Sequence, residues 1–87
     1  MTDVFVVQAQ QCAALFRLGR DVEASLAMSE LAGALQSAFD QAPPDNQQQW
    51  LQILGLMFHC QASQNWLALA DYLEYELVQV ITDSLSF

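Results

Sequence analysis

Basic side chains are almost missing from this sequence. Arginine and lysine together number 2 against 10 acidic residues, which gives a formal net charge of −8. Binding nucleic acid through its phosphates requires a basic surface, so this composition excludes that class of function. It also disfavours attachment to anionic membrane surfaces. The acidic surplus would attract a basic protein partner, although it would equally serve only to keep the protein in solution.

Charged residues of either sign are scarce, and long apolar runs are missing. Only 14% of the residues are charged and 54% are apolar, whereas an average chain has about 25% charged residues. No run approaches the ~18 uninterrupted apolar residues of a membrane span. A chain of 87 residues buries a limited share of its surface on its own. We therefore expect a second protein chain to cover the surplus, in a homodimer or a mixed complex.

Secretory and disulfide signals are also lacking. Residues 1–7 have no basic start and no small-residue cleavage site, so we expect no signal peptide and a cytoplasmic protein. The two cysteines, Cys12 and Cys60, would permit one disulfide, but outside the secretory pathway reduced, buried thiols are expected. Neither belongs to a Cys-x-x-Cys pair or has a basic neighbour in sequence that would lower its pKa.

Motifs for catalysis, phosphate binding and metal binding do not occur. There is no glycine-rich phosphate loop, nucleophile elbow or Cys/His metal spacing. The single histidine, His59, is predicted to face outward with Gln52 and Gly55. Cys60 lies about 100° around the helix from it, so the two cannot easily chelate one ion. We expect a non-enzymatic protein with no cofactor and no metal.

The sequence does contain strong helical periodicity. Apolar residues recur at i, i+3, i+4 and i+7 in four segments, residues 3–18, 21–41, 46–61 and 65–81. Gly19 and the Pro43-Pro44 pair interrupt the pattern, and short connections force neighbouring helices to be antiparallel. The prediction is an all-α domain over residues 1–87, a compact four-helix up-and-down bundle built from two αα-hairpins.

The two hairpins are predicted at residues 3–41 and 46–83, joined by a loop at residues 42–45. Residues 4–7 are β-branched and aromatic and could instead form a strand, but no second strand is available to pair with it. Each predicted helix presents one apolar stripe to the core, and three of them start at a capping side chain. The candidate caps are Thr2 or Asp3 for the first helix, Asp45 or Asn46 for the third, and Ser63 or Asn65 for the fourth, while the second helix runs from Asp21. The stripes are Phe5, Ala9, Cys12 and Phe16; Ala24, Ala27, Met28, Leu31, Leu35, Ala38 and Phe39; Trp50, Ile53, Leu54 and Met57; and Trp66, Leu69, Ala70, Leu73, Leu77, Val80 and Ile81.

Two outward faces carry apolar or aromatic residues where polar ones are usual. The candidate dimer face on the first helix comprises Val7, Ala14 and Leu18. The candidate protein-binding face on the fourth comprises Ala68, Asp71, Tyr72, Glu74, Tyr75 and Val78. Interface cores favour aromatic residues, although the two tyrosine rings could instead rest on neighbouring helices of the same chain.

The charged residues near these faces allow more than one reading. Asp71 and Glu74 share a side at i, i+3, where they would select a basic rim opposite or form a solvated acidic edge. Their spacing does not indicate a catalytic carboxylate pair. Arg17 complements the dipole of the first helix, and Arg20 is expected to pair with Glu23 or to reach Asp71 across the bundle.

Together these patterns favour a non-enzymatic protein–protein interaction module, such as a small acidic adaptor, a chaperone-like subunit or a regulator. The alternative is an acidic inhibitor or immunity-type protein that neutralises a basic protein partner by electrostatic complementarity. The apolar outward faces favour the first hypothesis, and the net charge favours the second.

Overall fold

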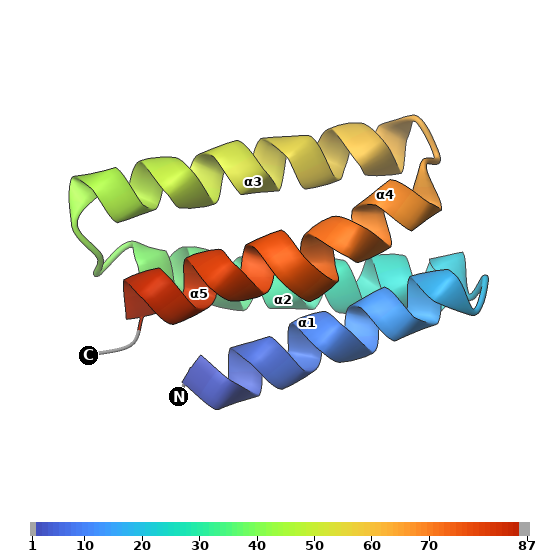
Figure 1. Cartoon of the computed structure of the whole chain (residues 1–87), viewed down its shortest axis with the longest axis horizontal. Coiled ribbons are helices and arrows are strands. Elements are labelled where there is room, and N and C mark those ends of the chain that lie inside the picture. Colours follow the sequence, from blue (N-terminus) through green and yellow to red (C-terminus); the bar gives the residue numbers. More distant parts are fainter. Residues whose placement is uncertain (1, 86–87) are drawn as a thin grey trace.

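The computed structural model describes residues 2–85, which form four helical rods arranged up and down (Figure 1). The first three rods are α1 (Thr2–Arg17), α2 (Asp21–Phe39) and α3 (Pro44–Ala62). The fourth is continuous and consists of α4 (Trp66–Asp71), the π-helical segment η1 (Tyr72–Glu76) and α5 (Leu77–Leu85). The predicted all-α four-helix bundle is confirmed. Residues 4–7 lie within α1, so the alternative of a strand there is wrong.

Two turns at one end of the bundle share a backbone motif. After α1, the amide of Gly19 donates to Phe16 and that of Arg20 to Leu15. After α3, Gln64 and Asn65 make the corresponding bonds to Gln61 and Cys60. Both are Schellman turns, which place one residue in the left-handed region. That residue is Gly19 in the first turn, with φ 76°, and Gln64 in the second, with φ 56°.

The start of α3 differs from the prediction. Neither Asp45 nor Asn46 caps this helix, because it begins at Pro44 with Pro43 in the capping position. Proline suits the first helical position, where its missing amide is not needed and its fixed φ is already helical. The loop therefore covers residues 40–43 rather than 42–45. The Asn46 amide instead donates to the hydroxyl of Ser84 at 2.9 Å, which ties α3 to the end of α5.

At the start of the fourth rod, one of the two candidate caps is confirmed. The side chain of Asn65 accepts a hydrogen bond from the backbone amide of Ala68, so Asn65 and not Ser63 is the cap. The rod extends beyond its predicted end, with α5 helical to Leu85 and Ser84 buried.

The predicted stripes form the core of the bundle. Most of their residues are buried, and the remainder are half-buried at the edges. The buried members are Ala9, Cys12, Phe16, Ala24, Met28, Leu31, Leu35, Phe39, Trp50, Ile53, Met57, Leu69, Ala70, Leu73, Leu77 and Ile81. The half-buried members are Phe5, Ala27, Ala38, Leu54, Trp66 and Val80. Trp66 is half-buried because its place in the first turn of α4 leaves it at the end of the bundle.

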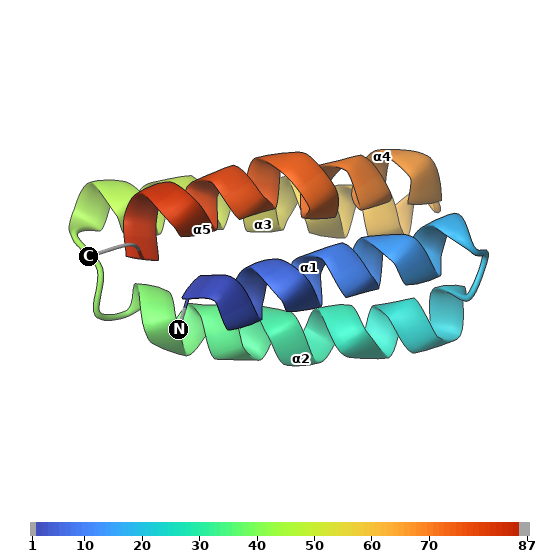
Figure 2. The same ribbon diagram turned by 60° about the horizontal axis from the view of Figure 1, so that its bottom comes forward.

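A stacked aromatic pair lies toward each end of the molecule. The rings of Phe39 and Trp50 are 5.3 Å apart with an interplanar angle of 6°. Those of Phe16 and Trp66 are 5.5 Å apart with an angle of 13°. Figure 2 shows the α2–α3 loop at one end of the bundle and both tight turns at the other. We call these the Trp50 end and the Trp66 end.

The π-helical segment was not predicted, and it has a packing reason. Leu69, Leu73, Leu77 and Ile81 are four residues apart and all fully buried. In a regular α-helix each four-residue step advances about 40° beyond a full turn, so this row would spiral away from the core. A π-helical turn holds more residues and brings the row back. The amide of Leu77 accordingly bonds to the carbonyl of Tyr72, five residues earlier.

Candidate protein-binding site

Arg17 connects α1 to the fourth rod at the π-helical segment. Its Nη2 atom donates to Asp71 Oδ1 and to Glu74 Oε2, each at 2.8 Å. Asp71 ends α4 and Glu74 lies within η1, so one guanidinium holds two carboxylates of the predicted face. The expectation that Arg20 reaches Asp71 is wrong. Arg20 pairs with Glu23 at 3.4 Å, which was the other alternative.

Position along α1 explains why Arg17 makes this contact. It follows the buried Ala13 by four residues, so it lies on the flank of α1 that packs against the fourth rod. Arg20 lies beyond the turn, immediately before α2. The hydrogen bonds that Arg17 donates to Asp71 and then to Glu74 raise the pKa of Arg17 above its ordinary value. The Arg17, Asp71 and Glu74 side chains are 35%, 62% and 33% exposed, so water screens these pairs and they add little stability. Their main effect is to fix where the two carboxylates lie.

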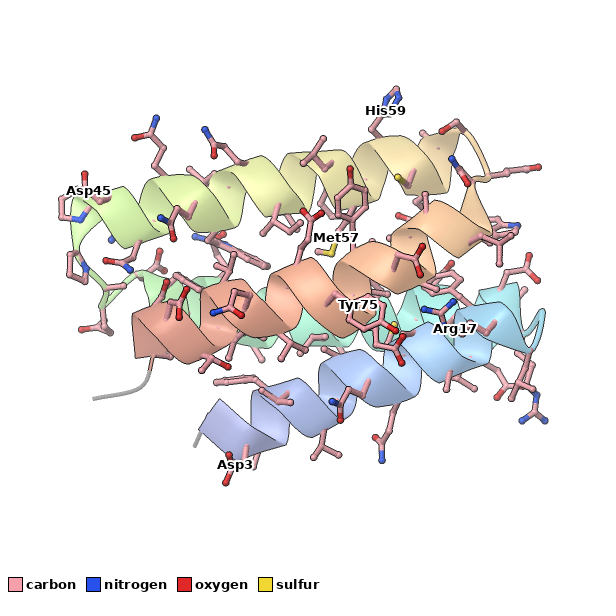
Figure 3. All side chains as sticks on the ribbon, viewed as in Figure 1. Asp3, Arg17, Asp45, Met57, His59 and Tyr75 are labelled. Atoms are coloured by element: carbon pink, nitrogen blue, oxygen red, sulfur yellow. The ribbon has the colours of Figure 1, made fainter. Side chains whose placement is uncertain are left out.

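Tyr75 is the aromatic residue of this cluster. Its side chain is on the same side of the bundle as Arg17 (Figure 3) and is 64% exposed. The neighbouring Glu74 carboxylate, as an acceptor for the phenol proton, raises the pKa of Tyr75 above its ordinary value. Arg17 therefore holds Glu74 in place, and Glu74 in turn influences the Tyr75 phenol, whose ring remains in water. We call Arg17, Asp71, Glu74 and Tyr75 the Tyr75 cluster.

The other members of the candidate protein-binding face are less accessible. Ala68, Tyr72 and Val78 are half-buried and pack against the core. The alternative expectation was that both tyrosine rings rest on helices of the same chain. Tyr72 packs in this way, whereas Tyr75 does not. The structure brings Asp71, Glu74 and Tyr75 together, and it adds Arg17, which sequence reasoning had assigned only to the dipole of α1.

The candidate dimer face of α1 points away from the core. Val7 is 48% and Leu18 71% exposed, and Ala14 is exposed as well. Val4 and Gln11, which sequence reasoning did not include, belong to the same exposed stripe. The signal for them was available, because positions 4, 7, 11, 14 and 18 alternate steps of three and four residues. We call these five residues the α1 stripe.

The remaining candidate chemistry is confined to isolated side chains. His59 is exposed beside Gln52 and Gly55, as predicted. Cys12 and Cys60 are free and buried, and the Cys12 thiol donates to the carbonyl of Ala24 at 3.3 Å. Burial raises the pKa of Cys12 to about 11, so the thiol stays protonated at neutral pH and is a poor nucleophile.

Two further properties of residues 2–85 bear on the class of site. Within that range, no cluster of three or more His, Cys, Asp or Glu side chains has the proximity needed to hold a metal ion. None of the helices there has the length and apolar character to cross a membrane.

Comparison of the chain with known protein families, curated proteins and solved structures found no match. The function of the Tyr75 cluster is therefore inferred from its own chemistry.

Proposed function

We propose that the protein is a non-enzymatic protein–protein interaction module, an adaptor, chaperone-like subunit or regulator, that binds a basic protein through the Tyr75 cluster. The observation that carries this proposal is an aromatic ring that is 64% exposed beside two carboxylates whose positions Arg17 fixes. Tyrosine is enriched among residues that dominate binding energy at interfaces, since it buries a large rigid area. Asp71 and Glu74 are already held by Arg17, so they lose little conformational entropy when a partner binds them.

The charges of the cluster support a basic partner. Asp71 and Glu74 contribute two negative charges and Arg17 one positive charge, and the whole chain carries −8. Arg17 contacts one oxygen of each carboxylate, and a carboxylate has room for several hydrogen bonds. A lysine or arginine of the partner could therefore bind beside Arg17 without displacing it. Basic residues around the partner's contact would also be steered toward this chain.

The backbone of the cluster supports a binding role as well. Glu74 and Tyr75 lie in η1, and π-helical insertions within α-helices occur frequently at functional sites. Here the insertion has a packing reason too, because it keeps the buried leucine row on the core. The same turn sets the position of Glu74 and Tyr75 on the outer side of the rod.

A second candidate function is an acidic inhibitor or immunity-type protein that neutralises a basic protein. The net charge of −8 favours it, and it would use the same cluster. The two candidates differ in salt dependence. An inhibitor steered mainly by charge would lose association rate steeply as salt is added. A module that depends on burying Tyr75 would keep most of its affinity.

Self-association and a cytoplasmic setting complete the proposal. The α1 stripe exposes apolar side chains that a second copy would cover, so the protein would be a homodimer in the absence of its partner. The Tyr75 cluster lies on the flank of α1 rather than on this stripe. Homodimer formation and partner binding therefore use neighbouring surfaces that meet at Arg17.

Site-specific photo-crosslinking in the cells that make the protein tests the binding surface. A photoreactive residue replacing Tyr75 should capture a discrete partner, whereas the same residue at Gln52, an exposed position on α3, should not. The captured partner can then be purified and titrated against variants. Equal capture at both positions, or none at position 75, would count against the proposal.

The substitution Tyr75→Ala gives the quantitative test. Losing the anchor should weaken partner binding by about 2 kcal/mol or more, while thermal unfolding of the isolated chain changes little. Leu67→Ala is the matched control, because Leu67 is equally exposed on the same rod but outside the cluster. If Tyr75→Ala instead lowered stability and left the affinity of the folded fraction unchanged, Tyr75 would be a packing residue.

A further inference from the structure

The α1 stripe has the spacing of a coiled-coil seam. Its residues alternate steps of three and four, which is the repeat of about 3.5 residues that keeps one side of a helix facing a partner helix. Four of the five are apolar and all five are exposed. The core stripe of α1 lies on the opposite side, where it packs against α2 and the fourth rod. One helix thus has two apolar sides, and only one of them is covered.

Charge on α1 favours a second copy of this chain as the cover. From Val4 to Phe16 the helix has no charged residue, and of the ten acids only Asp3 belongs to α1. Two chains that each carry −8 repel wherever their acidic surfaces meet. The uncharged middle of α1 is a surface on which they can approach without that repulsion.

We propose that the α1 stripe is the contact of a two-fold symmetric dimer in which the two α1 helices are antiparallel. This inference rests on the proposed function, because it takes self-association from there and adds the surface and its orientation. The ends of α1 decide the orientation, since Asp3 is at one end and Arg17 at the other. An antiparallel pair brings Asp3 of each copy level with Arg17 of the other, and symmetry makes this match twice. A parallel pair would oppose like charges at both ends.

The stripe also defines a register. With Asp3 level with Arg17 of the second copy, the two stripes interdigitate, so that Val4 lies between Ala14 and Leu18 of that copy and Val7 between Gln11 and Ala14. Gln11 is the one polar residue of the stripe, and a single polar residue in a seam specifies register at some cost in stability. Gln11 also lines a groove of about 230 Å³ between α1 and α2, together with Gln8, Cys12, Leu15, Ala27, Glu30 and Leu31. The groove gives side chains of the second copy room beside the seam.

The main rival surface is on α3, where Leu51 and Phe58 are exposed. This helix contains Asp45 and His59 but no lysine or arginine. A two-fold contact through α3 therefore has no lysine or arginine to place opposite Asp45, whereas a contact through α1 can place Arg17 opposite Asp3. Leu51 provides the matched control for the experiment, since it is apolar and exposed to a similar degree as Val7.

Sedimentation of the full chain over a wide concentration range tests which face associates. Wild type and Leu51→Glu should dimerise alike, whereas Val7→Glu should weaken the dimer by about tenfold or more, because a charge would be buried in the seam. Circular dichroism checks that both variants remain folded. A dimer broken by Leu51→Glu and not by Val7→Glu would overturn the choice of surface. A chain that stays monomeric throughout would remove self-association itself, and with it the antiparallel dimer, while leaving partner binding at Tyr75 to its own test.

Thiol crosslinking then tests the orientation independently of the charge variants. We expect Val4→Cys mixed with Ala14→Cys to give a crosslinked heterodimer under mild oxidation, with each variant alone giving little. The native cysteines are buried, so the wild-type chain is the blank. Efficient crosslinking of Val4→Cys alone, with none added by mixing, would show a parallel pair and would overturn the proposed orientation while keeping the dimer.

Discussion

The two ends of the bundle use the same aromatic pairing but are closed to different degrees. At the Trp50 end the indole is fully buried, and its Nε1 donates to Gln36 at 2.8 Å. The Asn46–Ser84 hydrogen bond closes the helix ends around it. At the Trp66 end the indole is half-buried, and the charged bridge nearby, centred on Arg17, is in solvent. We therefore expect stability to be concentrated at the Trp50 end, while the proposed binding surface lies toward the Trp66 end.

The largest effect is expected at the closed end. Trp50→Ala should lower the free energy of unfolding by about 3–5 kcal/mol, because it empties a buried site and leaves the ring of Phe39 without its stacking partner. Urea denaturation monitored by circular dichroism measures the change. Trp50→Phe is the control that keeps an aromatic ring and removes the bond to Gln36, at a cost of about 1 kcal/mol for that bond plus the lost volume. A cost below about 1 kcal/mol for Trp50→Ala would contradict the comparison.

The corresponding change at the open end should cost less. Trp66→Ala should lower the free energy of unfolding by about 2 kcal/mol, since a half-buried ring removes less apolar surface from water. The same urea experiment gives the value, and the ratio of the two tryptophan variants is the informative quantity. Equal costs would mean that the two ends are equally closed in solution.

The smallest effect concerns the two Schellman turns at the open end. Gln64 adopts a left-handed conformation that glycine occupies without strain, so Gln64→Gly should stabilise the chain by about 0.5–1 kcal/mol. Gly19→Gln is the reciprocal change and should destabilise by a similar amount. No atom lies within 4 Å of a side chain's first carbon at Gly19, so its cost would come from the backbone. Thermal melts of both variants should shift in opposite directions, and a loss of stability in Gln64→Gly would show that the Gln64 side chain contributes to the turn.

Most of the fold was predictable because it follows from periodicity. The helices, the breaks at Gly19 and the proline pair, and the inward stripes all depend on local sequence and on a spacing of about 3.6 residues. The start of α3 was predicted wrongly because polar residues after the prolines looked like caps, while Pro44 itself suits the first helical position.

The π-helical segment was missed for a different reason. Its signal is an unbroken row with four-residue spacing from Leu69 to Ile81, which a search for regular α-helix accepts as a good stripe. Trp66 was predicted to be buried because periodicity specifies the side of a helix that faces the core. It does not specify how far along the helix the core extends.

The candidate site could be predicted only in part. Asp71, Glu74 and Tyr75 stood out because an outward helix face rarely has that composition. The contact with Arg17 spans more than fifty residues of sequence, and no local pattern reports a contact of that kind. Predicting this contact requires the position of α1 relative to the fourth rod along the bundle axis. Turn geometry and core packing set that position, and neither helix sets it alone.

The reactivity of Cys12 reports whether α1 and α2 are packed together. Its thiol is buried between α1 and α2, and the raised pKa of about 11 keeps it protonated as long as the two helices are together. An alkylating reagent reacts with a thiolate, and an unfolded cysteine ionises near pH 8.5. The rate of Cys12 labelling at neutral pH therefore measures how often α1 separates from α2. The proposed dimer joins two copies through α1. If it holds α1 in place, the rate of Cys12 labelling should fall as protein concentration rises.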